Sequence, residues 1–359
     1  MKTKMKVTLL ALCAGVGPWL ACGSGTEVGM KISPGSGGGS GVAGMGVGGN
    51  STSGLGGATG AGGAVGTGGS GGLTGAGGTT TGVGGTVGGG GTTGTGGMVG
   101  GTGGAAPGPI KVLIWNNART YGHQSRTTAI PLLRAREATD NITFDLKYAH
   151  TATTTEGTID TTSDPSVFTD AGLDPYDVVF FLNTTGDTMD QDGQATTHRQ
   201  ALINFMNKGR GYVGTHSATD TYQGTSWPWY VDFMGANFAS HSNANTQGTA
   251  RYDQGVTSHP IFTAAATPNP WSRAEEWYTF TRDPLSSVIP GIKILLNCTD
   301  VSITTQRAIT WVHEMPLAPG APRTGRMFYT AFGHFVSAFQ EKAVMDMIIA
   351  GIKWAAYRL

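Results

Sequence analysis

Short apolar runs recur along the second part of the chain and predict a buried sheet. They are continuous rather than alternating, which is typical of strands that are buried on both faces. Helix-like patterns lie between them, around Ile130–Glu137 and Thr196–Asn207. Strands that alternate with helices at this spacing predict a doubly wound, mostly parallel α/β sheet with right-handed crossovers. The four runs lie at 111–115, 142–148, 177–183 and 211–215.

The pattern changes after Phe238 to polar strands and aromatic loops. Two further apolar runs follow, at 307–314 and 325–332, and predict two more strands. The last stretch, 341–357, carries apolar residues at three-to-four spacing and predicts a long helix that packs its apolar face into the core. These apolar residues are Val344, Met347, Ile348, Ile352 and Trp354.

The segment from Gly23 to Gly108 differs in composition from the rest of the chain. It holds most of the 60 glycines, many threonines, and only two charged residues, Glu27 and Lys31. Such a segment cannot bury enough apolar surface to offset its backbone entropy, so we predict a disordered Gly- and Thr-rich tether at 23–108. The remaining residues, 109–359, have the size of one large α/β domain.

Residues 1–22 have the pattern of an export signal, with lysines, then an apolar stretch, then a small residue before Cys22. The apolar stretch is too short, and too interrupted by glycine and Pro18, to predict a membrane span. The residues before Cys22 resemble a bacterial lipobox, although Trp19 stands where leucine is usual. We therefore expect an exported protein, either anchored to the membrane by a lipid on Cys22 or released into the periplasm or medium after simple cleavage.

The charge of the chain argues against nucleic-acid binding, and its cysteine content argues against a domain held together by disulfides. The chain has 23 basic and 23 acidic residues, and no basic patch indicates nucleic-acid binding. Cys298 is the only cysteine in 109–359, so a disulfide within the domain is impossible, and we expect this thiol to be buried. The sequence does not indicate an oligomeric state.

Reactive side chains follow several of the predicted strands. In open parallel sheets, ligands bind beyond the carboxyl ends of the strands. We therefore expect the polar residues at these places to face one cleft. They are His123 after the first strand, Asn183, Thr184 and Asp187 after the third, His216 and Asp220 after the fourth, and His334 after the last.

Seven motifs in this region resemble, in order, those of the ThuA-like (trehalose utilisation) family. They are YGHQS, FLNTTGD, GYVGTHSATDTY, WPWY, EEWYTF, TWVHE and FYTAFGH, and they cover nearly all of 109–359. The resemblance implies a flavodoxin-like fold of the class I glutamine amidotransferase type and a carbohydrate ligand. In that fold a nucleophilic cysteine occupies a sharp strand-to-helix turn, but here the corresponding residue is His216. Glutamine amidotransferase activity is therefore not expected.

The resemblance and the residue types together predict proton-transfer chemistry. His216 can exchange a proton near neutral pH, with Asp220 orienting its ring and His123 nearby. Adjacent strand residues point to opposite faces, so only one of Glu275 and Glu276 can enter the cleft, and the family pattern points to Glu276. That carboxyl can act as an acid or base if burial raises its pKa. Each of these residues also has a structural explanation, as a helix cap, a turn former or a solvated charge.

The expected substrate contacts come from polar residues and aromatic rings. Flat rings pack against sugar rings, although core packing is the competing explanation for each of them. The expected contacts are Asn183, Thr184, Asp187, Trp229, Tyr230, Trp277, Tyr278, His313 and His334.

Three functions remain open at this point. The first is a sugar-active enzyme that uses acid-base chemistry for hydrolysis, elimination or isomerisation. The second is a non-catalytic carbohydrate-binding module on a tether. The third is a metal-dependent hydrolase. The sequence has no zinc motif such as HExxH or CxxC, so it establishes no cofactor, but a divalent metal stays an option. The candidate ligands for such a metal are His123, His216, His259, His313 and His334.

Overall fold

The computed structural model describes residues 108–147, 154–256, 258–299, 301 and 308–359. The export signal, Cys22 and the glycine tract lie outside these residues, so export, lipidation and disorder stay predictions from the sequence. In the described part of the chain, no helix is long and apolar enough to cross a membrane.

The described strands form a nine-stranded sheet in the order β2-β1-β3-β4-β11-β10-β9-β6-β7. The first five strands in this order, here called the parallel half, pair in parallel, as in a flavodoxin-like fold. All five residues of β3 are buried, which explains the continuous apolar run that predicted it. The strands are β1 (Ile110–Trp115), β2 (Ile142–Leu146), β3 (Val178–Leu182), β4 (Gly211–Thr215) and β11 (Arg326–Thr330).

The other four strands, here called the antiparallel half, extend the sheet by antiparallel pairing. Because two successive antiparallel pairings restore the original direction, seven of the nine strands in this sheet still point the same way. The strands of this half are β6 (Thr246–Tyr252), β7 (Trp271–Glu275), β9 (Ile292–Cys298) and β10 (Ala308–Glu314). A separate two-stranded sheet pairs β5 (Phe238–His241) with β8 (Tyr278–Phe280).

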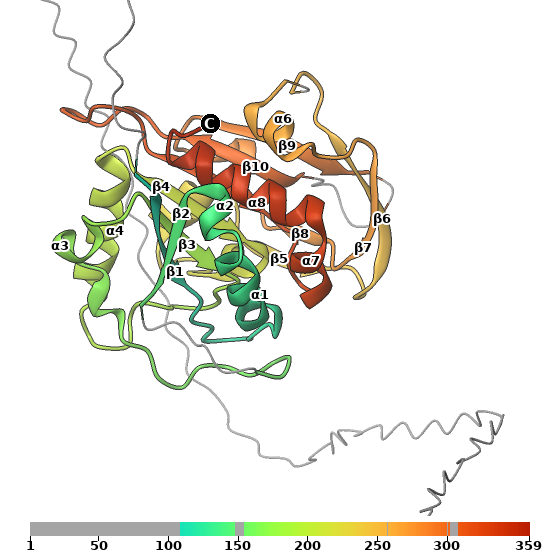
Figure 1. Ribbon diagram of the computed structural model, residues 1–359. Coiled ribbons are helices and arrows are strands. Elements are labelled where there is room, and N and C mark those ends of the chain that lie inside the picture. The colour runs from blue at the N-terminus through green and yellow to red at the C-terminus, as the bar shows by residue number, and fades with distance from the viewer. Residues whose placement is uncertain (1–107, 148–153, 257, 300, 302–307) are drawn as a thin grey trace, which may run out of the picture. The chain divides into compact units, whose positions relative to one another are not determined.

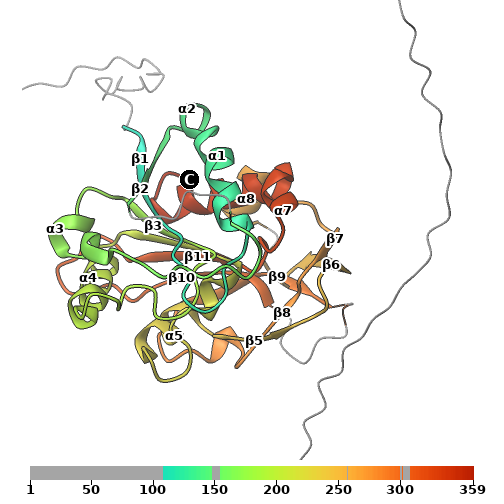
Figure 2. The ribbon, with the colours of Figure 1, turned by 90° about the horizontal axis from the view of Figure 1, so that it is seen from below.

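Helices cover both faces of the sheet, as Figures 1 and 2 show. Helices α1, α7 and α8 pack together on one face, and α8 lies on β4 and β11. Helices α3 and α4 pack together on the other face. The helices are α1 (Ser125–Arg134), α2 (Glu137–Asp140), α3 (Asp170–Leu173), α4 (Ala195–Asn207), α5 (Pro228–Met234), α6 (Pro260–Ala265), α7 (Val336–Gln340) and α8 (Lys342–Ala355), with 3₁₀ turns η1 (Pro165–Val167), η2 (His216–Asp220) and η3 (Pro284–Ser286).

The predicted α/β fold class is confirmed, and the element boundaries differ in one informative place. The first helix begins at Ser125, whereas the sequence pattern placed it around Ile130. The apolar pattern missed its first turn because that turn is polar, although it is buried. Arg126 in that turn forms a buried ion pair with Asp160, at 2.7 Å. An apolar pattern cannot reveal a helical turn that is buried through such a pairing. Cys298 is buried, as expected.

Candidate functional site

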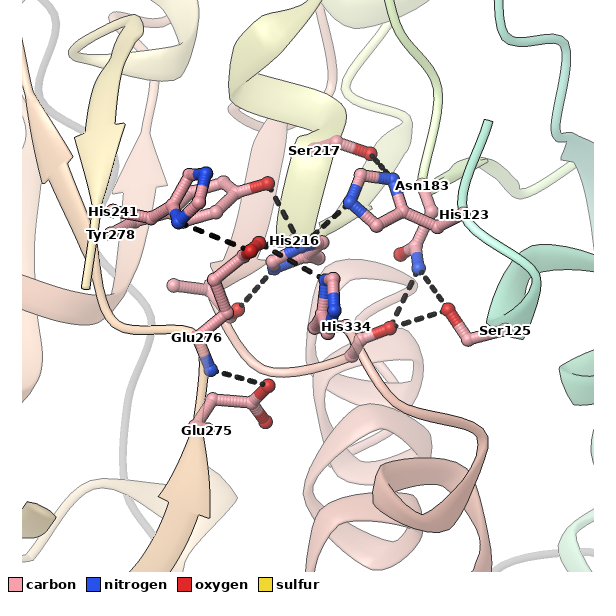
Figure 3. Close-up of polar contacts among 12 residues, drawn as sticks. His123, Ser125, Asn183, His216, Ser217, His241, Glu275, Glu276, Tyr278 and His334 are labelled. Carbon is pink, nitrogen blue, oxygen red and sulfur yellow. Dashed lines mark hydrogen bonds and ion pairs between the residues drawn. The ribbon is translucent and has the colours of Figure 1, made fainter. Parts of the chain in front are cut away.

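Three histidines meet at the carboxyl edge of the parallel strands, as Figure 3 shows. His123 lies between β1 and α1, His216 follows β4, and His334 follows β11. Glu276 reaches the same place from the connection between β7 and β8. One ligand atom from each of these four residues lies within 4.8 Å of the others, and we call this group the His₃Glu cluster.

The contacts inside the His₃Glu cluster are short. Nε2 of His216 lies 3.1 Å from Nε2 of His123 and 3.3 Å from Oε2 of Glu276. The same carboxylate oxygen lies 3.0 Å from Nδ1 of His334. The side chains of His123, His216 and Glu276 are buried, and that of His334 is 11% exposed. The cluster is therefore largely shielded from water, which strengthens electrostatic interactions within it.

The backbone of His216 forms the sharp turn that the sequence predicted. Its φ is +44°, in the left-handed region, and it joins β4 to the turn η2. Its Nδ1 donates a hydrogen bond of 2.8 Å to the carbonyl oxygen of Ala331, so the lone pair of Nε2 faces the cluster. The expectation that Asp220 orients this ring is wrong, because Ala331 occupies that role. The Asp220 carboxylate instead accepts a hydrogen bond from Gln223.

The lone pair of His216 Nε2 is crowded. The hydroxyl of Tyr278 lies 2.8 Å from it and His123 Nε2 lies 3.1 Å from it, so two groups compete for one acceptor. The carboxylate oxygen of Glu276 approaches the same lone pair, and two electron-rich atoms repel each other unless positive charge lies between them. Nδ1 of His334 is buried and close to Glu276, yet its direction of approach does not make a hydrogen bond.

The charges of the cluster shift its pKa values in different directions. Burial alone would raise the pKa of Glu276, but the close approach of His216 and His334 to its carboxylate outweighs burial and holds it well below its ordinary value. The condition for Glu276 to act as a proton donor is thus not met. Burial, with repulsion from His216 and His334, lowers the pKa of His123. Burial works against the charged form of His334 too, but the Glu276 carboxylate raises its pKa.

Asn183 ties together the three segments that carry the histidines. Its Oδ1 accepts a hydrogen bond from Thr215, next to His216, and its Nδ2 donates to Ser125 and to the carbonyl oxygen of Gly333, next to His334. Its side chain is buried and these bonds occupy both ends of its amide. Asn183 is therefore a positioning residue and not the substrate contact that the sequence suggested.

The loop that presents His123 packs tightly against a neighbouring segment. A Cβ atom on Gly122 would lie 1.7 Å from the carbonyl oxygen of Thr158, so only glycine fits there. Arg126 donates to that same oxygen at 3.2 Å and pairs with Asp160 through both of its terminal nitrogens. Close packing and a buried ion pair thus fix the position of His123.

Several expected substrate contacts lie in the core instead. Tyr230 is fully buried and its hydroxyl donates to the carbonyl oxygen of Ala218, while the indole of Trp277 donates to Thr246. These rings pack into the core because they offer more apolar surface than any other side chains. Three other residues are likewise placed by structural contacts, namely Trp229 stacked on Phe233, His313 bonded to the carbonyl oxygens of Phe233 and Pro290, and Thr184 bonded to Thr221.

Of the remaining expected residues, Tyr278 and Glu276 join the site and His259 does not. Glu275 forms a buried ion pair with Arg273 at 2.9 Å, so the choice of Glu276 agrees with the geometry. His259 caps α6 by accepting a hydrogen bond from the amide of Ile261.

Sequence reasoning missed two residues at the edge of the cluster. Nδ1 of His241, which is half exposed, lies 3.1 Å from Oε1 of Glu276. The ring of Tyr121 packs edge-on against His123 with centroids 5.1 Å apart. Tyr121 lies within the YGHQS motif, so its neighbour His123 was the available signal. His241 had no such signal, since it comes from β5, outside the parallel half.

The fold and the cluster define a class: a flavodoxin-like α/β domain with a His₃Glu cluster at the carboxyl edge of its parallel strands. The sequence profile of the ThuA family, described as trehalose utilisation, matches residues 111–355, and the chain belongs to this family. Comparison with curated proteins gives no match.

Two solved structures of ThuA-like proteins have the same fold. One, from Bacteroides uniformis, is 21% identical with a TM-score of 0.52, and the match covers 71% of this chain and 95% of that one. The other, from Parabacteroides merdae, is 16% identical with a TM-score of 0.51, and the match covers 69% of this chain and 90% of that one.

Proposed function

We propose that this protein is an enzyme that acts on a carbohydrate with the help of a divalent metal ion held by the His₃Glu cluster. The single observation that carries the proposal is the convergence of four metal-ligating groups within 4.8 Å in a largely buried place. The carbohydrate part is supported by the family's description as trehalose utilisation.

The donor set fits a transition metal better than magnesium or calcium. Imidazole nitrogens suit zinc and iron, whereas magnesium and calcium prefer oxygen ligands alone. A tetrahedral ion with bonds of about 2.0–2.2 Å has neighbouring ligand atoms about 3.3–3.6 Å apart. The cluster shows 3.1 Å between His123 and His216, and 3.3 Å between His216 and Glu276. A cation among these atoms would also relieve the repulsion between the Glu276 oxygen and the His216 lone pair.

The surrounding residues prepare the ligands for a cation. Ala331 fixes the tautomer of His216 so that its Nε2 lone pair faces the cluster, which is a common arrangement around metal-binding histidines. The lowered pKa values of Glu276 and His123 keep both in the deprotonated form that binds metals.

The chemistry that we propose is proton transfer at a sugar hydroxyl or next to a carbonyl, in hydrolysis, elimination or isomerisation. The metal would supply Lewis acidity toward a sugar oxygen. Asp220 would exchange the proton, because burial raises its pKa to about 7 and a group with such a pKa transfers protons well at neutral pH. A pair of carboxyl groups with pKa values shifted in opposite directions, here Asp220 and Glu276, is a frequent mark of divided roles in catalysis.

The alternative of a non-catalytic carbohydrate-binding module loses its main support. It rested on the aromatic rings of WPWY and EEWY. Trp227, Tyr230 and Trp277 are buried in the core, and Trp229 packs against it. We therefore do not propose it.

The test is metal analysis of the purified full-length chain, followed by titration of metal-stripped protein with Zn²⁺, Mn²⁺ and Fe²⁺. We expect about one equivalent of metal per chain, and a loss of affinity of at least about 100-fold in His216→Ala, because this removes a ligand. His198→Gln is the matched control, since His198 lies on α4, outside the cluster, and its ring nitrogens contact the carbonyl oxygen of Phe168 and the carboxylate of Asp192.

Activity on glycosides and keto-sugars completes the test. Turnover should disappear on metal removal and return on reloading. Full turnover by stripped protein, or the absence of binding by all three ions, would show the proposal to be wrong.

A further inference from the structure

A pocket of about 700 Å³ opens beside the His₃Glu cluster. Two of its residues contact members of the site directly. Tyr121 packs against His123, and the ring of Phe238 lies 4.5 Å from that of Tyr278, whose hydroxyl contacts His216. The full lining is Arg119, Thr120, Tyr121, Gly186, Asp187, Gln191, Asp220, Gln223, Ser226, Phe238 and Ala239.

The aromatic rings of the pocket are more exposed than those of the core. Tyr121 is 44% exposed, while most large rings of the described chain are buried. Phe238 is only partly buried, at the start of β5. Partly exposed rings beside a polar cleft are available to a ligand, and their faces match the apolar C–H surface of a pyranose ring.

The polar part of the lining favours a neutral ligand with many hydroxyl groups. It offers the carboxylates of Asp187 and Asp220, together with the amides and hydroxyls of neighbouring residues. One oxygen of Asp187 accepts a hydrogen bond from Ser226 at 2.7 Å, and a carboxylate has about four acceptor positions, so capacity remains. Arg119 is the only cation in the lining, and its guanidinium already donates to the carbonyl oxygen of Asp160. The balance of charge works against a phosphate or another anion.

We propose that this pocket binds one or two pyranose units of a neutral carbohydrate, with Tyr121 and Phe238 against the sugar faces and Asp187 and Asp220 on its hydroxyls. The inference rests on the proposed function, because it places the bound sugar so that its next oxygen reaches the His₃Glu cluster. The connection between the two places is short, since Asp220 ends the same 3₁₀ turn that begins with His216. The raised pKa of Asp220 lets its carboxyl both donate to and accept from hydroxyl groups near neutral pH.

The experiment is calorimetric titration of the full-length chain, metal-loaded and metal-stripped, with trehalose, maltose and inorganic phosphate as probes. We expect a disaccharide to bind and phosphate not to bind. Tyr121→Ala and Asp187→Asn should each weaken disaccharide binding at least about tenfold, whereas Tyr121→Phe should retain most of it, because the ring face rather than the hydroxyl makes the contact. Leu285→Ala, at an exposed position that lines a different pocket, should bind as wild type does.

The outcomes separate this inference from the proposed function. Loss of disaccharide binding in Tyr121→Ala with metal content unchanged supports the pocket, and it does so even if no metal is found in the wild type. Metal binding without any disaccharide binding overturns the pocket assignment alone. Unchanged binding in both pocket variants, or tighter binding of phosphate than of both sugars, overturns it as well.

Discussion

The two halves of the sheet contribute to the site in different ways. The parallel half supplies His123, His216 and His334, each from the segment that follows the carboxyl end of a strand. The other side of the site supplies Glu276, from the connection between β7 and β8, and Tyr278, from the start of β8. The parallel topology therefore gathers the nitrogen ligands by a general rule. The negative charge that completes the cluster depends on how the other half folds against it.

The carboxyl groups from the two sides show the same contrast. Asp220, from the parallel half, is partly buried without a cationic partner, and this burial raises its pKa to about 7. Glu276 is also buried, but His216 and His334 stabilise its charged form and lower its pKa. Burial acts in the same direction on both groups. The histidines beside Glu276 therefore decide its charge state, and only the meeting of the two halves places them there.

The largest expected effect is on the free energy of unfolding, when the buried ion pair of each half is broken in turn. Asp160→Ala leaves Arg126 fully buried without its carboxylate, so we expect the free energy of unfolding to fall by about 3–5 kcal/mol. Glu275→Ala should cost less, about 1–3 kcal/mol, because Arg273 keeps Glu341 at 2.9 Å. Urea denaturation of the two variants measures both values. Equal losses would show that the second carboxylate gives Arg273 no protection.

The next effect concerns how the parallel half holds its histidines. Asn183→Ala removes the bonds to Thr215, Ser125 and Gly333, so we expect metal affinity to fall about 10- to 100-fold although Asn183 touches no ligand atom. Titration of stripped protein with Zn²⁺ gives the affinity, and Asn204→Ala on α4 is the matched control. Lower stability with unchanged metal affinity would contradict the positioning role.

The smallest effect tests the contrast between the two carboxyl groups. The folded-state pKa of Asp220 is raised to about 7, above an unfolded value of about 3.9, so the folded state binds this proton more tightly. The contribution of Asp220 to stability is then fully present below about pH 4 and is lost as pH rises to about 7.

Asp220→Asn cannot ionise, so it should be more stable than wild type at pH 8 and equally stable near pH 4. The rise of the Asp220 pKa to about 7 sets an upper limit of about 4 kcal/mol, and solvent around the partly buried Asp220 reduces the expected gain to roughly 1–2 kcal/mol. Thermal or urea unfolding at the two pH values measures this difference. The exposed Asp174→Asn variant should show no such pH dependence. A constant difference between Asp220→Asn and wild type at both pH values would refute the assignment.

Local sequence patterns were sufficient for the parallel half of the sheet and for part of the site. The apolar runs located the central strands β3 and β4 because every residue of these strands is buried, and that requirement acts residue by residue. The same logic placed His123, His216 and His334 together, since each follows such a run. The choice of Glu276 over Glu275 came from the resemblance to the family, because Glu276 lies just beyond the end of β7, where the alternation of side chains along a strand no longer applies.

Other assignments depended on contacts between distant residues, and the tertiary structure alone decided them. Asn183 became a positioning residue through a partner 150 positions away, Gly333, and His216 is oriented by Ala331, 115 positions away. Whether a ring serves the core or a pocket, as with Tyr230 and Tyr121, depends on which segments cover it. Sequence pattern reports the polarity of a residue and its neighbours along the chain, while burial, charge state and hydrogen-bond partners are set by the neighbours in space.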